Sequence, residues 1–185
     1  MSSLLAFEEV ALARGGRMLF ERLTFALGPG QAVHVAGPNG SGKSSLIRLA
    51  AGLLEAARGR VERTAEAALA DDHLALDREL PLGKALALWA RSDVGHALEA
   101  AGIAPLAPVP VRLLSSGQRK RATLARVYAA NASLWLLDEP LNTLDEAGVA
   151  ALGVAMARHR AGGGAILAAS HAALPGEWTR VELGQ

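Results

Sequence analysis

Two apolar runs at the start of the chain predict a β-hairpin. Residues 4–13 and residues 18–27 are rich in hydrophobic side chains, and the turn-forming sequence RGGR at residues 14–17 separates them. Apolar, partly alternating runs on either side of a glycine pair are typical of two antiparallel strands joined by a tight turn. We therefore expect an antiparallel β-subdomain at the N-terminus.

The next segments predict a strand, a loop and a helix in succession. Residues 31–36 form a short apolar run with two valines, a glycine-rich stretch follows, and residues 43–51 have helical hydrophobic periodicity. Residues 65–70 predict a further short strand.

The second half alternates between helical and strand patterns. Residues 116–130 and 145–160 carry helical periodicity, whereas residues 133–138 and 165–169 are short apolar runs typical of buried strands. Strands that alternate with helices imply a mostly parallel sheet, which binds ligands at the carboxyl ends of its strands. The fold class expected is therefore α/β.

Length and proline content suggest how this fold is organised. A chain of 185 residues is expected to form a single domain. Residues 71–111 are rich in Ala and Leu and are interrupted by several prolines, which predicts a small helical subdomain. The core is then expected to comprise residues 1–70 and 112–185.

Charge and composition exclude several functional classes. Nineteen Lys and Arg residues face 18 Asp and Glu residues, a net charge of +1 that argues against a protein relying on a broad basic field to bind nucleic acid. The absence of cysteine removes disulfides, thiolate metal sites and cysteine nucleophiles. No apolar run is long enough to span a bilayer, so a membrane role is expected to depend on a partner.

One segment predicts a phosphate-binding loop. It matches the pattern G-x-x-x-x-G-K-[ST], follows a predicted strand and opens a predicted helix. The candidate ATP-binding residues are Gly37, Pro38, Asn39, Gly40, Ser41, Gly42, Lys43 and Ser44, followed by Ser45. Backbone amides and the helix N-terminus attract phosphate, the lysine supplies a positive charge, and the Ser44 hydroxyl is a candidate Mg²⁺ ligand.

A second strand delivers two carboxylates toward this loop. The apolar residues 134–137 precede Asp138 and Glu139. Alone, this pattern is an ordinary strand end, but beside a phosphate-binding loop it predicts that Asp138 holds Mg²⁺ and that Glu139 takes a proton from the attacking water.

The sequence Leu114-Ser115-Ser116-Gly117-Gln118 opens the predicted helix 116–130. Taken alone it is a helix N-cap, and the basic residues 119–121 after it are a solvated face. With the other motifs it resembles the LSGGQ signature of ABC-transporter ATPases, with Ser116 in place of the first glycine. The phosphate loop, the acidic strand, the D-loop at residues 143–145 and His171 follow the same family's order.

This resemblance implies a P-loop NTPase fold of the ABC-ATPase type, which hydrolyses ATP with Mg²⁺. It further implies a head-to-tail homodimer in which the phosphate loop of one protomer and the signature of the other enclose each ATP. Ser115, Ser116, Gly117 and Gln118 then serve the partner's nucleotide, Asp145 contributes from the D-loop, and His171 contacts the γ-phosphate and the attacking water.

Two positions depart from the family pattern. The glutamine that usually contributes to the Mg²⁺ site falls near Asp72 and His73, so His73 is the expected substitute. The aromatic residue that usually stacks on adenine is absent, and Arg14 lies nearest its place. Either side chain could equally be a plain solvated residue.

The short chain and its motif sequences are similar to the ATPase subunits of cytochrome c maturation, which export heme. That similarity implies membrane subunits like CcmB and CcmC and a peripheral place on the cytoplasmic face of the bacterial inner membrane. No histidine has the context of a heme ligand. The alternatives are an ATPase for transport of another small solute, a soluble ABC-type ATPase outside transport, and a nucleotide-binding module without turnover.

Overall fold

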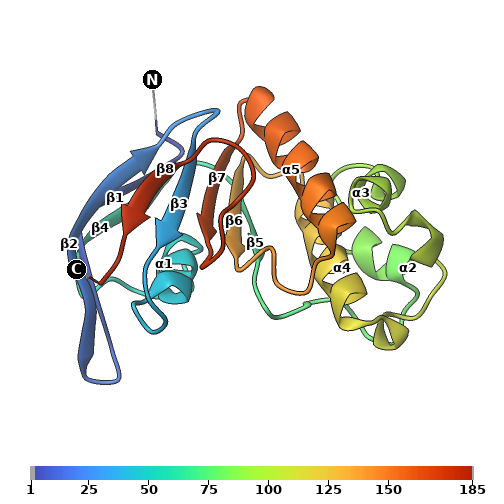
Figure 1. Ribbon diagram of the computed structural model, residues 1–185, viewed down its shortest axis with the longest axis horizontal. Coiled ribbons are helices and arrows are strands. Elements are labelled where there is room, and N and C mark those ends of the chain that lie inside the picture. Colours follow the sequence, from blue (N-terminus) through green and yellow to red (C-terminus); the bar gives the residue numbers. More distant parts are fainter. Residues whose placement is uncertain (1–2, 185) are drawn as a thin grey trace.

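The computed structural model describes residues 3–184, which form two sheets with helices between and beside them (Figure 1). An antiparallel sheet has the strand order β2-β1-β4, and a parallel sheet has the order β5-β6-β7-β3-β8. The α/β class, the parallel core sheet and the N-terminal antiparallel sheet are confirmed.

The antiparallel sheet contains the expected hairpin and one strand that the hydrophobic pattern did not predict. Strands β1 (Leu5–Arg14) and β2 (Arg17–Leu27) pair around the glycine turn. Strand β4 (Arg58–Arg63) pairs with the other edge of β1. Its sequence RGRVER has almost no apolar side chains, so the pairing of its backbone with β1, and not a hydrophobic face, makes it a strand.

The parallel sheet lies at the centre of the molecule. Its strands are β3 (Ala32–Ala36), β5 (Ala67–Ala70), β6 (Leu134–Asp138), β7 (Ala165–Ala169) and β8 (Thr179–Glu182). Every residue of β6 and β7 is buried, which explains their uninterrupted apolar sequences. The edge strand β8 was not predicted, because its sequence TRVE is mostly polar and exposed.

Helices cover both faces of this sheet. Helix α1 (Lys43–Ala50) packs between the two sheets, in one hydrophobic core with residues of β1, β3, β6 and β7. Helices α4 (Ser116–Ala129) and α5 (Glu146–Ala161) contribute to a second core on the opposite side, as Figure 1 shows.

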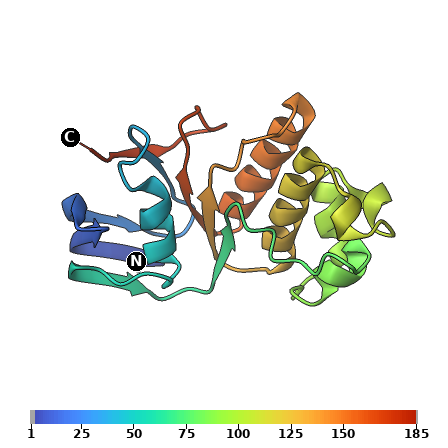
Figure 2. The same ribbon diagram turned by 90° about the horizontal axis from the view of Figure 1, so that it is seen from below.

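The segment expected to be helical forms a third hydrophobic cluster against α4. It contains two short helices, α2 (Leu82–Ala87) and α3 (Val94–Ala100), and two 3₁₀ turns at Ala104–Leu106 and Val111–Leu113. Figures 1 and 2 both place α2 and α3 at the opposite end of the molecule from the antiparallel sheet.

Candidate functional site

The glycine-rich loop between β3 and α1 requires its glycines. Gly37 has φ +147°, and a Cβ there would lie 2.5 Å from the carbonyl oxygen of Leu183. Gly42 is the N-cap of α1 with φ +102°, and no side chain caps the helix. The first amides of α1 are therefore available to an anion, in the geometry that binds phosphate at helix N-termini.

Lys43 lies inside this loop. Only 7% of the residue is exposed, and its Nζ donates hydrogen bonds to the carbonyl oxygens of Gly37 (2.8 Å) and Pro38 (3.0 Å). The loop thus curls around the ammonium group, which places a positive charge beside the free amides of α1. This is the electrostatic environment that a polyphosphate requires.

A cleft of about 430 Å³ opens at this loop. The strand ends bring Glu139 to it, and the β1–β2 turn brings Arg14 and Gly15. The full lining is Arg14, Gly15, Leu19, Asn39, Gly40, Gly42, Lys43, Ser44, Ser45 and Glu139. Residues expected to bind the phosphates, the expected catalytic base Glu139, and Arg14, which is expected near the adenine ring, therefore lie in one cleft.

Asp138 lies at the carboxyl end of β6, against the start of α1. The Ser44 hydroxyl donates a hydrogen bond of 3.0 Å to its Oδ1, and burial raises the pKa of the Asp138 carboxyl. A hydroxyl and a carboxylate that meet at a phosphate site are the hard oxygen ligands that Mg²⁺ prefers. These residues fit Mg²⁺.

Glu139 and His171 meet at the ends of neighbouring strands. The Nδ1 atom of His171 lies 2.9 Å from Oε2 of Glu139, and the Glu139 side chain is 20% exposed. Glu139 has φ +45°, a left-handed conformation that residues with a Cβ rarely adopt. This backbone geometry directs the carboxylate out of the buried strand and toward the cleft.

His73, the expected substitute for the family's glutamine, lies outside the phosphate cleft. Its Nδ1 lies 3.2 Å from Oδ2 of Asp71, and its side chain is 78% exposed. It is not among the residues that line the phosphate cleft. The neighbouring residue Asp72 does influence the site, because its negative charge raises the pKa of both Asp138 and Lys120. The sequence analysis expected His73 at this position, whereas in the structure the charge of Asp72 reaches the residues of the site.

The signature begins α4 and is held by its own side chains. The Ser115 hydroxyl accepts a hydrogen bond from the amide of Gln118, whose side-chain oxygen accepts one from the amide of Ser115. This reciprocal capping box fixes the start of the helix. A Cβ on Gly117 would lie 3.0 Å from the carbonyl oxygen of Thr143, so the signature packs closely against the D-loop.

Asp145 also has a structural role. It caps α5 by accepting a hydrogen bond of 2.9 Å from the amide of Gly148, and it forms an ion pair with Arg121. These contacts lower the pKa of Asp145. A second cleft, of about 470 Å³, is lined by Asp145, Thr143, the signature and the segment around Gly102. It shares no lining residue with the phosphate cleft.

Two basic residues of α4 were not identified as important from the sequence. The interpretation of residues 119–121 as a solvated face does not hold for Lys120, which is 8% exposed and whose Nζ donates to the carbonyl oxygen of Asp138. Burial lowers its pKa. The available signal was its spacing: Lys120 precedes the buried Leu124 and Val127 by four and seven residues, on the same helical face.

Arg126 was the other residue missed. Its Nη2 donates a hydrogen bond of 2.6 Å to the carbonyl oxygen of Leu69, and its guanidinium lies 5.1 Å from the centre of the Trp89 ring. It thereby ties α4 to β5 and to the turn that follows α2.

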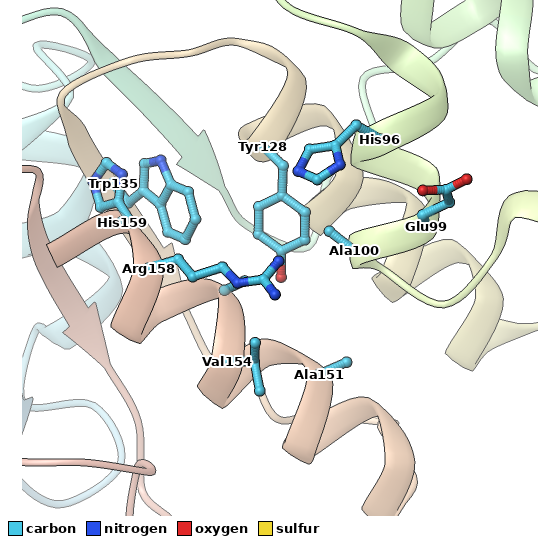
Figure 3. Close-up of a pocket in the computed structure, with 10 residues that line it drawn as sticks. His96, Glu99, Ala100, Tyr128, Trp135, Ala151, Val154, Arg158 and His159 are labelled. Carbon is cyan, nitrogen blue, oxygen red and sulfur yellow. The ribbon is translucent and has the colours of Figure 1, made fainter. Parts of the chain in front are cut away.

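A further hollow of about 460 Å³ lies away from the phosphate cleft, among α3, α4 and α5 (Figure 3). Trp135 stacks on His159 with ring centres 3.9 Å apart and lies 5.1 Å from the Tyr128 ring. Burial lowers the pKa of His159. Trp135 belongs to β6, Tyr128 to α4 and His159 to α5, so these side chains pack where the parallel sheet meets the two helices (Figure 3).

A strand, a glycine-rich loop and a helix that enclose a lysine, beside a Ser–Asp pair and a Glu–His pair, define a P-loop nucleotide hydrolase. A family model described as ABC transporter matches residues 20–142. The chain belongs to the ABC transporter family of ATP-binding proteins, and it binds and hydrolyses ATP in a transport-coupled cycle.

Relatives and solved structures agree with this family. The chain is 56% identical to "Cytochrome c biogenesis ATP-binding export protein CcmA" of Sphingopyxis alaskensis, covering 94% of this chain and 93% of that one. It is 51% identical to the protein of the same name from Zymomonas mobilis, over 92% and 79%.

Two solved structures show the same fold. An ATP-binding subunit of an ABC transporter superposes with a TM-score of 0.82 at 23% identity, covering 91% of this chain and 80% of that one. An ABC transporter ATP-binding protein from Pyrococcus furiosus gives 0.84 at 20% identity, over 97% and 96%.

Proteins of this family work with membrane partners in an ABC complex. Within residues 3–184, no helix combines the length and the hydrophobicity needed to cross a membrane.

Proposed function

We propose that this chain is the ATPase subunit of a cytochrome c biogenesis exporter, and that its hydrolysis of ATP drives release of a heme-loaded chaperone. The observation that carries the proposal is 56% identity, over nearly the whole of both chains, with a protein named for ATP-binding export in cytochrome c biogenesis. Membrane subunits similar to CcmB and CcmC would anchor the chain to the cytoplasmic face of the inner membrane.

The phosphate cleft supports the binding half of this activity. The amides at the start of α1 and the Lys43 ammonium hold the phosphates, and Arg14 lies at the cleft where its planar guanidinium can stack on the base. Ser44 and Asp138 would hold Mg²⁺, which supplies positive charge to the phosphate oxygens when bound. His73, which pairs with Asp71 and is largely exposed, has no hydrogen bond with Ser44 or Asp138 among residues 3–184 and is left out of the proposed Mg²⁺ site.

The Glu139–His171 pair supports the hydrolytic half. The Glu139 carboxylate accepts the proton of the attacking water, and the His171 imidazole orients that carboxylate and contacts the γ-phosphate. Because the two side chains hydrogen-bond directly, each restricts the rotamers of the other, which is how a base is held ready for one water molecule.

The separation of the two clefts supports a head-to-tail homodimer. Ser115, Ser116, Gly117 and Gln118 lie at the N-terminus of α4, outside the phosphate cleft of their own protomer. Their amides and the positive end of the helix dipole suit a phosphate group. A second copy, turned by a two-fold rotation, places this signature and the Asp145 loop over the ATP of its partner.

The proposal is tested in a bacterium that encodes the chain, by replacing the chromosomal copy with the Glu139→Gln variant. We expect covalently bound heme in c-type cytochromes to disappear from membranes, while b-type cytochromes persist. An ATPase for another solute would leave c-type cytochromes unchanged, and an ABC ATPase outside transport would not co-purify with membrane subunits. Either result contradicts the proposal.

A further inference from the structure

Lys120 is a buried cation that the mechanism above does not use. It lies one helical turn after Ser116, the first residue of α4, and is 8% exposed. Its Nζ donates a hydrogen bond of 3.2 Å to the carbonyl oxygen of Asp138. Among residues 3–184, no carboxylate oxygen comes within 4.0 Å of this nitrogen. Its specific contact is therefore with backbone and not with a carboxylate.

That contact falls on the peptide unit that joins Asp138 to Glu139. The carbonyl oxygen of the unit accepts from Lys120, and its amide, which belongs to Glu139, donates a hydrogen bond of 2.8 Å to the carbonyl oxygen of Ala169. The unit is thus held on one side by α4 and on the other by the end of β7.

The orientation of this peptide unit decides where Glu139 points. Glu139 has φ +45°, a conformation that a residue with a Cβ adopts only when its surroundings enforce it. If the 138–139 peptide were free to rotate, the backbone would relax toward negative φ, and the carboxylate would turn away from His171. The two hydrogen bonds oppose that rotation.

We propose that Lys120 is a positioning residue for ATP hydrolysis, which fixes the Asp138–Glu139 peptide unit so that the Glu139 carboxylate meets His171. The inference rests on the proposed role of Glu139 as the base. Lys120 acts through Glu139 and does not itself touch the water or the phosphates. Loss of Lys120 should therefore reduce the turnover rate and leave ATP binding nearly unchanged.

The test compares Lys120→Met and Lys120→Arg in the complex isolated with its membrane partners. Lys120→Met keeps most of the side-chain length and removes the donors, whereas Lys120→Arg keeps a cationic donor. We expect kcat to fall at least tenfold in Lys120→Met, with the Kd for ATP within threefold of the parent, and to recover most of its value in Lys120→Arg. Lys84→Met, at an exposed lysine of α2, is the matched control and should behave as the parent.

A double variant separates positioning from general damage. In the Glu139→Gln background, where the base is gone, Lys120→Met should cause no further loss of the residual single-turnover rate. If Lys120→Met does not fold, Lys120→Gln is measured in its place, with the same expectations.

Three results would overturn the inference: parental kcat in Lys120→Met, equal losses of ATP affinity and turnover, or a further loss of full size in the Glu139→Gln background. A parent complex without ATPase activity would instead overturn the proposed function, and parental turnover in Glu139→Gln alone would overturn the proposed role of Glu139 as the base. The two failures are therefore distinguishable.

Discussion

The Nδ1 atom of His171 lies 2.9 Å from Oε2 of Glu139. The two residues are far apart in the sequence, but they follow the adjacent parallel strands β7 and β6, whose last paired residues are Ala169 and Asp138. A parallel sheet brings the carboxyl ends of its strands to one edge, so a histidine and a glutamate placed just beyond two strands must meet there. Glu139 lines the phosphate cleft, and His171 contacts Glu139 from the neighbouring strand end, so the pair is the proposed hydrolytic group.

Replacing the base should separate binding from turnover. Glu139→Gln keeps the size and hydrogen-bonding capacity of the side chain and removes its ability to accept a proton. We expect kcat to fall by about 10²–10⁴-fold, the usual contribution of a positioned general base, with little change in the Kd for ATP. Steady-state ATPase assays and equilibrium binding measure this. Glu55→Gln, at an exposed residue, is the control; parental kcat in Glu139→Gln would show that another group is the base.

Removing the imidazole should have a smaller effect than removing the carboxylate. In His171→Ala the Glu139 side chain loses the contact that orients it but can still accept a proton. We expect kcat to fall by about 10–100-fold, within the range for loss of an orienting group. His171→Gln, which can still donate to Glu139, should retain more activity than His171→Ala. Equal activity in these two variants would contradict an orienting role.

The phosphate-loop lysine should govern affinity. Lys43→Ala removes the ammonium group that Gly37 and Pro38 hold in the loop, and we expect the Kd for ATP to rise by at least tenfold, consistent with loss of a charge-assisted contact. Binding of ADP should weaken by less, because it lacks the γ-phosphate. Lys84→Ala provides the comparison at an exposed lysine; unchanged ATP affinity in Lys43→Ala would remove the lysine from the binding site.

The stacked histidine should make stability depend on pH. Burial lowers the pKa of His159, so below the ordinary histidine pKa of about 6.5 the unfolded chain takes up a proton that the folded protein resists. The free energy of unfolding should then decrease as the pH falls through this value, by up to about 1.4 kcal/mol per pH unit for one proton.

His159→Phe keeps a ring against Trp135 and cannot titrate, so urea unfolding at pH 7.5 and 5.5 should show a weaker pH dependence than in the parent. His96→Gln, at an exposed histidine, should keep the parental dependence. An identical pH dependence in His159→Phe and the parent would exclude His159 as the cause.

The sequence was sufficient for elements that carry a strong local signal. Strands β6 and β7 are almost entirely apolar because both faces of the parallel sheet are covered, and the phosphate loop has glycines at φ +147° and +102°, which residues with a Cβ rarely adopt. Strands β4 and β8 were missed because backbone pairing at a sheet edge needs no hydrophobic pattern, and both sequences are mostly polar.

The contacts of individual polar side chains were harder to foresee. Motif spacing located Asp138 and Glu139, but the burial of Lys120 depends on how α4 packs against the end of β6, which is a tertiary arrangement. Likewise, the pairing of His73 with Asp71 follows from the local turn after β5 and has no counterpart in the hydrophobic pattern.

In the proposed dimer, each ATP lies between the phosphate loop of one protomer and the signature of its partner. Because the chain has no native cysteine, this arrangement can be tested by disulfide crosslinking of two single-cysteine variants, Asn39→Cys and Ser116→Cys. Both positions are exposed. The variants are made in the Glu139→Gln background and mixed before oxidation.

We predict a crosslinked dimer when both variants are present with ATP and Mg²⁺, and much less with ADP or with either variant alone. If the mixture hydrolyses ATP when Glu139 is restored but never forms this crosslink, or forms it equally without nucleotide, ATP does not lie between two protomers.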